Sequence, residues 1–311
     1  MRAESVKYYL KHPQAFLMRV SGAGLLNWIP DKPYLLWYYR LIIKMRLNLK
    51  SPKTFTEKIQ WLKLYNRTPL HTRISDKYAV REYIANRVGM EYTVPLLGIW
   101  NTFEEIDFDE LPEQFVLKTT HDCGGNYICR DKRLLDISAA KDKIERHLRH
   151  NYYPYYREWA YKDIRPRIIA EEYLVDESGY ELKDYKFMCF NGHPKYVNVC
   201  KNRESQAHPA VDMFDMQWKP LEDKIRYRDY QPSGCVFERP QSFEKMIEFC
   251  KILAKPFPFV RVDFYNIQGE IYIGELTLYP AAGYAVYETN TMNETVGSWL
   301  ILPERKKEQK A

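Results

Sequence analysis

Several features that would place this chain in a common class of protein are missing from its sequence. Its six cysteines form no CxxC pair, so reduced thiols packed in cores are favoured over a zinc site or a disulfide framework. No apolar run approaches the roughly 20 residues that a membrane-spanning helix needs. The N-terminal stretch MRAESVKYYLKH also lacks the apolar segment and the cleavage site of a signal peptide. We therefore expect a cytoplasmic protein.

The sequence also lacks patterns that would identify a partner directly. The Walker pattern GxxxxGK[ST], which cradles phosphates in many nucleotide-binding proteins, is absent. Outside residues 1–50 there is no basic stripe and no recognisable motif of a nucleic-acid reader, so we expect no nucleic-acid partner. Internal repeats and low-complexity linkers are missing as well.

The chain does contain enough apolar residues for large cores. It has 311 residues, of which 45% are hydrophobic and 15% aromatic, and this composition excludes disorder. The net charge of +6 is unevenly distributed, because residues 1–50 carry +7 and the remaining residues carry −1. The basic character of the protein therefore belongs to its N-terminal segment.

Residues 33–49, PYLLWYYRLIIKMRLNL, mix aromatic and aliphatic side chains with cations. A helix with this pattern either packs its apolar side on the body of the protein or lies at an anionic membrane surface. Both interpretations stay open from the sequence. The second would bring residues 1–50 into peripheral contact with the inner face of the membrane.

Residues 258–283 predict two alternating strands joined by a short polar turn. Arg261 and Asp263 share one face of the first strand, and Glu275 and Thr277 share one face of the second. If the two faces coincide, two carboxylates and a hydroxyl converge, and burying them is costly unless a cation neutralises them. Oxygen ligands without Cys or His favour Mg²⁺. An ordinary hairpin with exposed acids is the alternative.

A glycine loop between two strands is predicted at 115–130. The apolar run FVLKTT contains Lys118 near its end, and the loop HDCGGN at 121–126 follows it. Small glycine loops let backbone N–H groups approach phosphate oxygens closely, whereas a plain hairpin turn is the structural alternative. A strand is predicted at 166–175, with Glu171 and Glu172 followed by Tyr173 and Leu174. These residues suit an adenine pocket, and a pair of solvated glutamates is the alternative interpretation.

Helices and antiparallel hairpins account for the rest of the chain. The capping box at 54–57 opens one helix, and a second helix is predicted from Ser75 to Gly89. Lys77 would then lie in a first helical turn, where the macrodipole disfavours a cation, which indicates an anionic partner. Asn191-Gly192 is a hairpin signal, and residues 201–240 are expected to be loop-rich. This order of elements predicts an α+β fold rather than a doubly wound sheet.

Taken together, these segments resemble the ATP-grasp superfamily, and within it the TupA-like group associated with teichuronopeptide and other cell-surface polysaccharide biosynthesis. The similarity covers about residues 54–303. It is carried by FTEKIQWLKLYNRTPL, DKYAVREYI, YTVPLLGIW, QFVLKTTHDCGGN, PRIIAEEYL, DYKFMCFNGHPKY and the hairpin at 258–283. The resemblance implies an ATP-grasp fold with antiparallel sheets and a glycine flap, preceded by an N-terminal helical segment.

The resemblance implies a nucleotide-binding role for residues in several segments. The phosphates of ATP would contact Lys77 and Lys118 beneath a flap that includes His121, Gly124, Gly125 and Asn126. The adenine would lie against Glu171, Glu172, Tyr173 and Leu174, and the ribose would contact Asp184. Lys186 and Arg203 would contact phosphate or substrate.

The resemblance also implies a metal site and catalytic residues. Asp263 and Glu275 would hold Mg²⁺ together with Thr277, which stands where the superfamily usually has Asn. Arg261 would stabilise the transition state, with Lys118 beside the phosphates. The implied parts of the chain are a basic helical segment (1–53), an αβ part (54–110), a small subdomain with the flap (111–175), a large subdomain with the metal site (176–303) and a charged tail (304–311).

The implied function is an ATP- and Mg²⁺-dependent carboxylate–amine ligase with an acylphosphate intermediate. Its substrates would be an amino acid and a sugar or uronic acid on a glycan precursor of the cell surface. One alternative is a glycosyltransferase of polysaccharide biosynthesis that uses a nucleotide sugar, for which Asp107-Phe108-Asp109 supplies a DxD pattern. Another is a non-catalytic scaffold that keeps the fold. The sequence does not indicate an oligomeric state.

Overall fold

Two antiparallel sheets form the frame of the molecule. The computed structural model describes residues 13–179, 182–201, 210–221 and 224–305. The smaller sheet has the strand order β1-β4-β2-β3, with the bounds β1 (Leu96–Trp100), β2 (Phe115–Thr119), β3 (Asn126–Cys129) and β4 (Ile168–Glu172). The larger sheet has the order β7-β6-β5-β8-β9, with the bounds β5 (Asp184–Phe190), β6 (His193–Lys201), β7 (Ala210–Asp215), β8 (Phe259–Ile267) and β9 (Glu270–Thr277).

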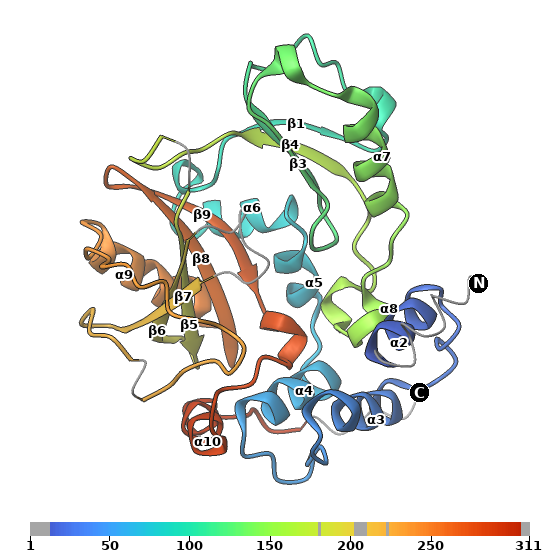
Figure 1. The fold of residues 1–311 in the computed structure, drawn as a ribbon, viewed down its shortest axis with the longest axis vertical. Helices are drawn as coiled ribbons and strands as arrows, with labels where there is room; N and C mark the ends of the chain where they lie inside the picture. Colours follow the sequence, from blue (N-terminus) through green and yellow to red (C-terminus); the bar gives the residue numbers. More distant parts are fainter. Residues whose placement is uncertain (1–12, 180–181, 202–209, 222–223, 306–311) are drawn as a thin grey trace.

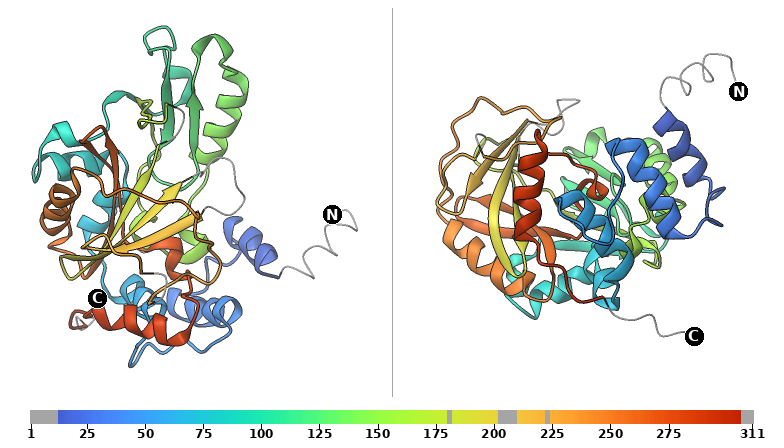
Figure 2. Two further views of the ribbon diagram at one scale, coloured as in Figure 1. Left: turned by 60° about the vertical axis from the view of Figure 1, so that its left-hand side comes forward. Right: turned by 90° about the horizontal axis from the view of Figure 1, so that it is seen from below.

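Helices cover the sheets and fill the N-terminal side of the molecule. Their bounds are α2 (Pro13–Gly22), α3 (Asp31–Ile43), α4 (Phe55–Tyr65), α5 (Pro69–Ser75), α6 (Ala79–Ala85), α7 (Ile137–Leu148), α8 (Tyr153–Tyr156), α9 (Phe243–Ala254) and α10 (Asn290–Trp299). Helix α7 packs on β2 and β3, and α9 packs on β5, β6 and β8. Figure 2 shows the small sheet and α7 at one end of the molecule, with α3 and α4 at the other. The described helices and sheets confirm the predicted α+β class.

Turn chemistry fixes the register of the large sheet. Asn191 and Gly192 connect β5 to β6 with φ of 49° and 83°, and Gln268 and Gly269 connect β8 to β9 with φ of 51° and 94°. Two successive residues with positive φ form the tight turn that matches the twist of paired strands. The Asn-Gly hairpin predicted from the sequence is therefore confirmed, and the β8–β9 turn fixes which residues face each other at 258–283.

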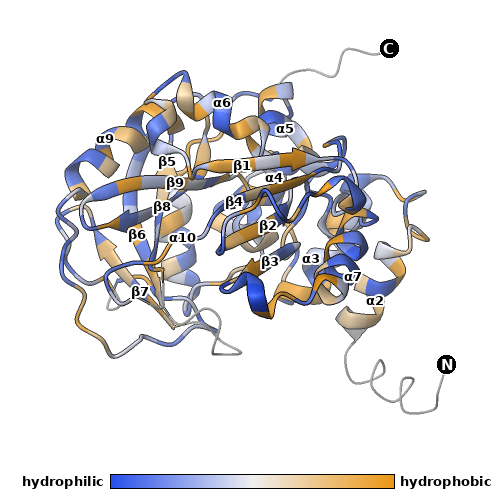
Figure 3. Ribbon diagram, turned by 90° about the horizontal axis from the view of Figure 1, so that it is seen from above, coloured by the Kyte–Doolittle hydropathy of each residue, from blue (hydrophilic) through white to orange (hydrophobic). Residues whose placement is uncertain are grey.

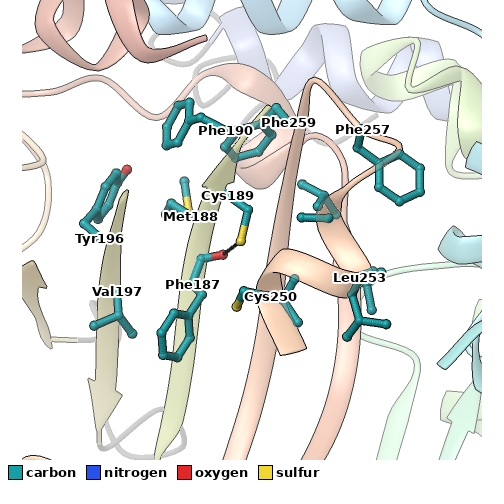
Figure 4. Packing of buried hydrophobic residues seen from close by; sticks show 14 of the residues in the cluster. Phe187, Met188, Cys189, Phe190, Tyr196, Val197, Cys250, Leu253, Phe257 and Phe259 are labelled. Carbon is teal, nitrogen blue, oxygen red and sulfur yellow. Dashed lines mark hydrogen bonds between the residues drawn. The ribbon is translucent and has the colours of Figure 1, made fainter. Parts of the chain in front are cut away.

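Three apolar clusters hold the elements together. The largest lies around the large sheet, a second lies between the small sheet and α7, and a third lies around α3. Figure 4 shows Cys189 and Cys250 packed among the aromatic and aliphatic side chains of the largest cluster. Both are free thiols, as are the other four cysteines. The expectation of reduced, mostly buried cysteines is thus met.

Amphipathic patterns determine which helix faces are buried. Figure 3 shows hydrophilic and hydrophobic residues alternating along α7 and α9. Helix α3 buries Tyr34, Leu35, Tyr38 and Tyr39, and the opposite face remains in solvent. The interpretation of 33–49 as a packing helix is therefore correct for one face of α3. Among the described residues, no helix is both long and apolar enough to cross a membrane.

One local prediction differs from the structure. Helix α6 begins at Ala79 rather than near Ser75, and no side chain caps its first turn. The chain forms a turn at residues 76–78 instead, in which the Asp76 carboxylate accepts hydrogen bonds from the backbone N–H groups of Tyr78 and Ala79. Lys77 therefore precedes the helix, and the macrodipole argument for it was wrong. The described residues of 201–240 lie outside helices and strands except for the end of β6 and for β7, so the expectation of a loop-rich segment is confirmed.

Candidate active site

One cavity of about 700 Å³ lies where the two sheets meet the N-terminal helices. Strands β2, β4, β5, β8 and β9 all contribute side chains to it, so it joins segments that are far apart in the sequence. The predicted site residues that line it are Lys77, Lys118, Gly124, Gly125, Asn126, Glu171, Asp184, Lys186, Arg261, Asp263, Glu275 and Thr277. The structure thus brings most of the predicted site together around one space.

The β8–β9 register creates the acidic cluster that the sequence suggested. Asp263 pairs with Glu275 across the two strands, and Arg261 pairs with Thr277, so all four side chains share one face. Arg261 donates from Nε to Asp263 Oδ1 at 2.6 Å, and from Nη2 to Asp263 Oδ2 at 2.7 Å and Glu275 Oε1 at 2.5 Å. Thr277 Oγ1 donates to the same Glu275 oxygen at 2.9 Å. The predicted convergence of two carboxylates and a hydroxyl is confirmed.

The neighbouring strand β5 adds a cation and a third acid to this cluster. Lys186 Nζ lies 2.6 Å from Asp263 Oδ2 and 3.0 Å from Asp184 Oδ2. The cluster then contains three carboxylates and two cations. Since Asp184 and Asp263 are almost fully buried, the unbalanced negative charge favours a further cation.

The donor atoms of the cluster fit a magnesium ion. The described residues include no group of three or more His, Cys, Asp and Glu side chains suited to a metal. Asp263 and Glu275 each place one oxygen within hydrogen-bonding distance of the same Arg261 nitrogen, so the two carboxylates are close together. Mg²⁺ is often held by only one or two carboxylates, and nucleotide phosphates and water supply its other oxygens. Two carboxylates and a hydroxyl match this pattern.

The electrostatics of the cluster keep Glu275 ionised. Burial would raise the pKa of Glu275, but the positive charges of Arg261, Lys186 and Lys77 outweigh burial and hold that pKa well below its usual value. The side chain of Glu275 also remains 42% exposed, so the effect of the cations dominates. Glu275 therefore carries a negative charge across the physiological pH range.

A second ion-pair group lies on the small sheet. Lys118 Nζ contacts Glu171 Oε2 at 2.5 Å, and Arg81 Nη1 lies 3.6 Å from Glu171 Oε1. Strand pairing brings Lys118 and Glu171 onto one face, whereas Glu172 belongs to the opposite face and is exposed at the end of β4. Arg81 was not identified from the sequence, where it is one of several charged residues on α6.

Two predicted parts of the nucleotide site lie elsewhere. Tyr173 and Leu174 are outside the cavity lining, and the Tyr173 hydroxyl accepts a hydrogen bond from Arg130 Nε at 3.1 Å. His121 is buried and contacts the His150 carbonyl at 3.0 Å, also outside the lining. The remaining candidate, Arg203, lies outside the described residues.

The loop between β2 and β3 is tight and anchored on both sides. Gly124 has a φ of +93°, and a Cβ atom on Gly125 would lie 1.8 Å from Thr119 Oγ1, so both positions require glycine. The Asp122 carboxylate contacts Thr119 and His147, and Lys77 donates to the Asp122 carbonyl. The structure thus places Lys77 directly against the glycine loop. The role of this loop as a flap over phosphates stays a prediction.

The other half of the cavity was not predicted. We define the tyrosine chamber by its acid Glu158 and by the ring residues Tyr38, Tyr152, Tyr156, Tyr161, Tyr279 and Tyr284. Helices α2 and α3 also reach it, because Met18 and Ile42 line the cavity. The tyrosine-rich stretch 151–163 was the available sequence signal, but the position of this stretch beside 279–284 depends on the fold.

Backbone strain marks the wall of the tyrosine chamber. Ala281 and Ala282 have φ of 47° and 52°, a conformation that costs a non-glycine residue free energy. The Ala282 carbonyl accepts hydrogen bonds from the buried Lys63 Nζ at 2.6 Å and from Gln60 Nε2 at 3.2 Å. These two donors from α4 hold the strained turn in place.

The DxD pattern on which the glycosyltransferase alternative rested lies away from the cavity. Asp107 and Asp109 are exposed, and Asp107 Oδ1 accepts a hydrogen bond from the Asp109 backbone N–H at 2.9 Å within a local turn. Neither residue lines the cavity. The geometry therefore gives this alternative no support.

Comparison with known structures finds several ligases with limited similarity to this chain. An L-amino acid ligase from Bacillus licheniformis is 10% identical with a TM-score of 0.47, and the match covers 88% of this chain and 61% of that one. A D-alanine–D-alanine ligase from Helicobacter pylori is 15% identical with a TM-score of 0.43, covering 79% and 69% of the two chains. A D-alanine–D-alanine ligase from Bacillus anthracis, in complex with ATP, is 16% identical with a TM-score of 0.41 and covers 66% of this chain.

The match between this chain and the Bacillus anthracis ligase spans 55% of the length of that ligase. No curated protein sequence matches the chain. The family model described as TupA-like ATPgrasp matches residues 57–301, which is most of the chain and contains every strand of both sheets. The protein therefore belongs to the TupA-like ATP-grasp family.

Proposed function

We propose that this protein is an ATP-dependent ligase that joins a carboxylate to an amine. The observation that carries the proposal is the composition of this cavity. One half holds Arg261, Lys186 and Lys118 beside four strand-borne carboxylates, and the other half is lined by tyrosines. A charged half suits a nucleotide triphosphate, and the adjoining aromatic half suits a second substrate. Membership in the ATP-grasp family supports the same reaction class.

The residues of the charged half have distinct roles in this proposal. Lys77 and Lys118 neutralise phosphate oxygens beside the glycine loop, and Arg261 stabilises negative charge that develops as the acyl group is transferred. Asp263 and Glu275 would hold Mg²⁺, which would neutralise negative charge on the terminal phosphates of ATP. Burial of these groups strengthens each interaction, because water screens charge less inside the cavity.

The arrangement also requires that existing ion pairs open. Arg261 binds Asp263 and Glu275, and Lys118 binds Glu171. A nucleotide would exchange these internal contacts for contacts with phosphate and metal. Phosphate binding at Lys118 would leave Glu171 paired with Arg81, so the carboxylate would keep a cationic neighbour.

The finer assignment concerns substrates and pathway. We propose that the amine is an amino acid, that the carboxylate belongs to a sugar or uronic acid, and that the product contributes to a cell-surface polysaccharide. The tyrosine chamber supports a ring-shaped or amine-bearing substrate, because aromatic side chains supply broad apolar surfaces with polar tips. The surface-polysaccharide role rests on the resemblance of the sequence to the TupA-like group.

We also propose that the N-terminal segment contacts an anionic membrane surface. The outward face of α3 carries the exposed side chains Leu36 and Trp37 between the cations Lys32 and Arg40. Trp28, just before α3, is also largely exposed. Apolar side chains flanked by cations are the pattern of a helix that lies in a lipid headgroup layer. Such contact would bring the cavity close to a lipid-linked acceptor.

Calorimetric titration with a non-hydrolysable ATP analogue and Mg²⁺ tests the proposed nucleotide site. The parent protein should bind the analogue, and the Asp263→Asn/Glu275→Gln variant should lose most of that affinity. Asp163→Asn, an exposed acid outside the cavity, is the matched control. If the parent instead binds a nucleotide sugar and does not bind the ATP analogue, the ligase proposal fails.

A further inference from the structure

The tyrosine chamber surrounds one acid. Glu158 lies between α8 and the short 3₁₀ turn at Trp159–Tyr161, and its side chain lines the cavity. Tyrosines from two distant segments lie around it: Tyr152 and Tyr156 belong to the α8 segment, and Tyr279 precedes the strained turn that contains Ala282. This chamber and the charged half form one continuous cavity.

The Glu158 carboxylate is buried and incompletely satisfied. The residue is 3% exposed, and its Oε2 has no hydrogen-bond partner among the described residues. Leaving a carboxylate oxygen buried without a partner is costly, so such groups usually serve a bound ligand or a specific structural charge. An unpartnered acid in the wall of a cavity points to a ligand that supplies a donor.

Lys63 is the nearest structural counter-charge, but its ammonium has other partners. It donates to the carbonyls of Tyr156 and Ala282 at 3.0 and 2.6 Å. It does not line the cavity, and it is not within ion-pair distance of Glu158 in the described part of the chain. Lys63 therefore braces the chamber wall and moderates the charge of Glu158 without satisfying its carboxylate.

The electrostatic influence of Glu158 extends over the whole chamber. Burial raises the pKa of Glu158 to about 7, and the charge of Lys63 opposes this rise. Burial also raises the pKa of the Tyr152 and Tyr161 hydroxyls, and the charge of Glu158 raises both further. The surrounding tyrosines therefore remain neutral, and the chamber as a whole is attractive to a cation.

The tyrosine rings and the Glu158 carboxylate together suit an ammonium group. Aromatic faces attract an ammonium through their quadrupoles, and a desolvated carboxylate pairs with it directly. A substrate carboxylate would be repelled by Glu158 and attracted to Lys118, Lys186 and Arg261 in the charged half. The two halves thus orient an amine and a carboxylate in opposite directions.

We propose that the tyrosine chamber binds the ammonium group of the amine substrate, with Glu158 as its anionic partner. This assignment rests on the proposed ligase function and names the substrate class of that site. The class is a primary amine carried by an amino acid. Glu158 is a binding residue in this assignment, and the neighbouring tyrosines are the walls that exclude water around the ion pair.

Calorimetry with common L-amino acids, in the presence of Mg²⁺ and a non-hydrolysable ATP analogue, tests the assignment. At least one amino acid should bind the parent, and its N-acetyl form, which lacks the ammonium, should not. Glu158→Gln should weaken that binding about 100-fold, because one partner of a buried charge pair is removed. Binding of the ATP analogue should be unchanged, and Asp163→Asn should bind the amino acid as the parent does.

The pH dependence provides a second readout. Affinity for the amino acid should fall as pH decreases below about 7, since Glu158 then becomes protonated. The Glu158→Gln profile should be flatter in this range, and the slope that remains comes from Lys63, whose pKa burial lowers to about 7. The other ionisable groups that face or adjoin Glu158 are Lys63, Cys123, Tyr152, Tyr156, Tyr161, Tyr279 and Tyr284.

Three results would overturn the assignment: equal binding of the N-acetyl form, unchanged affinity in Glu158→Gln, or no binding of any amino acid by a parent that binds the ATP analogue. If the parent does not bind the analogue, the proposed ligase function fails instead. Thermal unfolding checks that Glu158→Gln is folded. If it is not, Glu158→Asp keeps the charge on a shorter side chain and should weaken amino-acid binding alone, whereas unchanged affinity would contradict the assignment.

Discussion

The two halves of the cavity are built in different ways. The charged half stands on strands β2, β4, β5, β8 and β9, whose side chains are fixed by register, whereas the tyrosine chamber is assembled from helices, short turns and the N-terminal segment. Strand pairing positions Asp263 against Glu275 through a two-residue turn a few positions away. By contrast, Tyr38, Glu158 and Tyr284 meet only after distant parts of the chain have packed. A charged half fixed by strand register is thus joined to a chamber whose shape depends on packing of the whole fold.

The sharpest test of this comparison is a pair of variants with opposite effects. Asp263→Asn should weaken binding of the Mg²⁺-bound ATP analogue about 100-fold, because Arg261 and Lys186 lose their shared buried carboxylate. Its affinity for an amino acid, measured without nucleotide, should stay at the parent value. Glu158→Gln should show the reverse pattern. Calorimetry measures both affinities, and a variant that loses both would show that the two halves act as one unit.

The strained wall of the chamber should be sensitive to one added methyl group. Gly283 has a φ of +72°, and a Cβ atom there would lie 2.5 Å from Ile59 Cγ2 and 2.7 Å from Gln60 Nε2. Gly283→Ala should therefore lower the free energy of unfolding by about 2 to 3 kcal/mol. Chemical denaturation measures this change.

Ala281 is the matched control for the glycine variant, because it is exposed and also has a positive φ. Ala281→Gly should change the free energy of unfolding by less than about 1 kcal/mol, with relief of strain offsetting the entropy of glycine. Equal losses in both variants would show that the turn is sensitive to any change and not to the space around Gly283.

The buried acid of the chamber should give a characteristic pH dependence of stability. The pKa of Glu158 rises from 4.5 to about 7 on folding, so the folded state binds more protons than the unfolded state between these values. The parent should therefore lose stability as pH rises from about 4.5 to 7, and Glu158→Gln should lose less over the same interval. Urea denaturation at a series of pH values checks this, with Asp163→Asn expected to follow the parent.

The smallest expected effect is on membrane binding by the exposed face of α3. Trp37→Ser/Arg40→Ser should reduce binding to phosphatidylcholine vesicles that contain phosphatidylglycerol by about 10-fold, since an apolar anchor and a cation are lost. Trp37 is 50% exposed. The matched control is Leu134→Ser/Arg133→Ser, a second exposed apolar and cationic pair, which lies near the small sheet. Equal loss in both variants, or equal binding to pure phosphatidylcholine, would remove the proposed membrane contact.

The charged half could be largely anticipated from local patterns. Alternation places Arg261 with Asp263 and Glu275 with Thr277, and the turn residues between the strands make the two faces coincide. Lys118 was found because it lies near the end of an apolar strand before a glycine loop. These patterns span only a few residues, so they can be recognised without knowledge of the rest of the fold.

The residues that the sequence did not reveal depend on packing between distant segments. Arg81 gains its importance only because packing of α6 brings it near Glu171 on β4. Glu158 is one acid in an aromatic connector, and no local pattern separates it from a solvated glutamate. Lys77 lines the cavity as predicted, but the reason given for it was wrong, because α6 begins two residues later, at Ala79.

The sequence by itself determined the class of fold, the family and the strand-borne acids and cations, because alternation and turn chemistry are local properties. Only the tertiary structure decided that Met18, Tyr38 and Ile42 of the N-terminal segment form part of the cavity wall. It also decided that Glu158 is buried with an unpartnered oxygen. Burial changes a carboxylate from a solvated surface charge into a group that attracts a cation, and burial is a property of packing between distant segments.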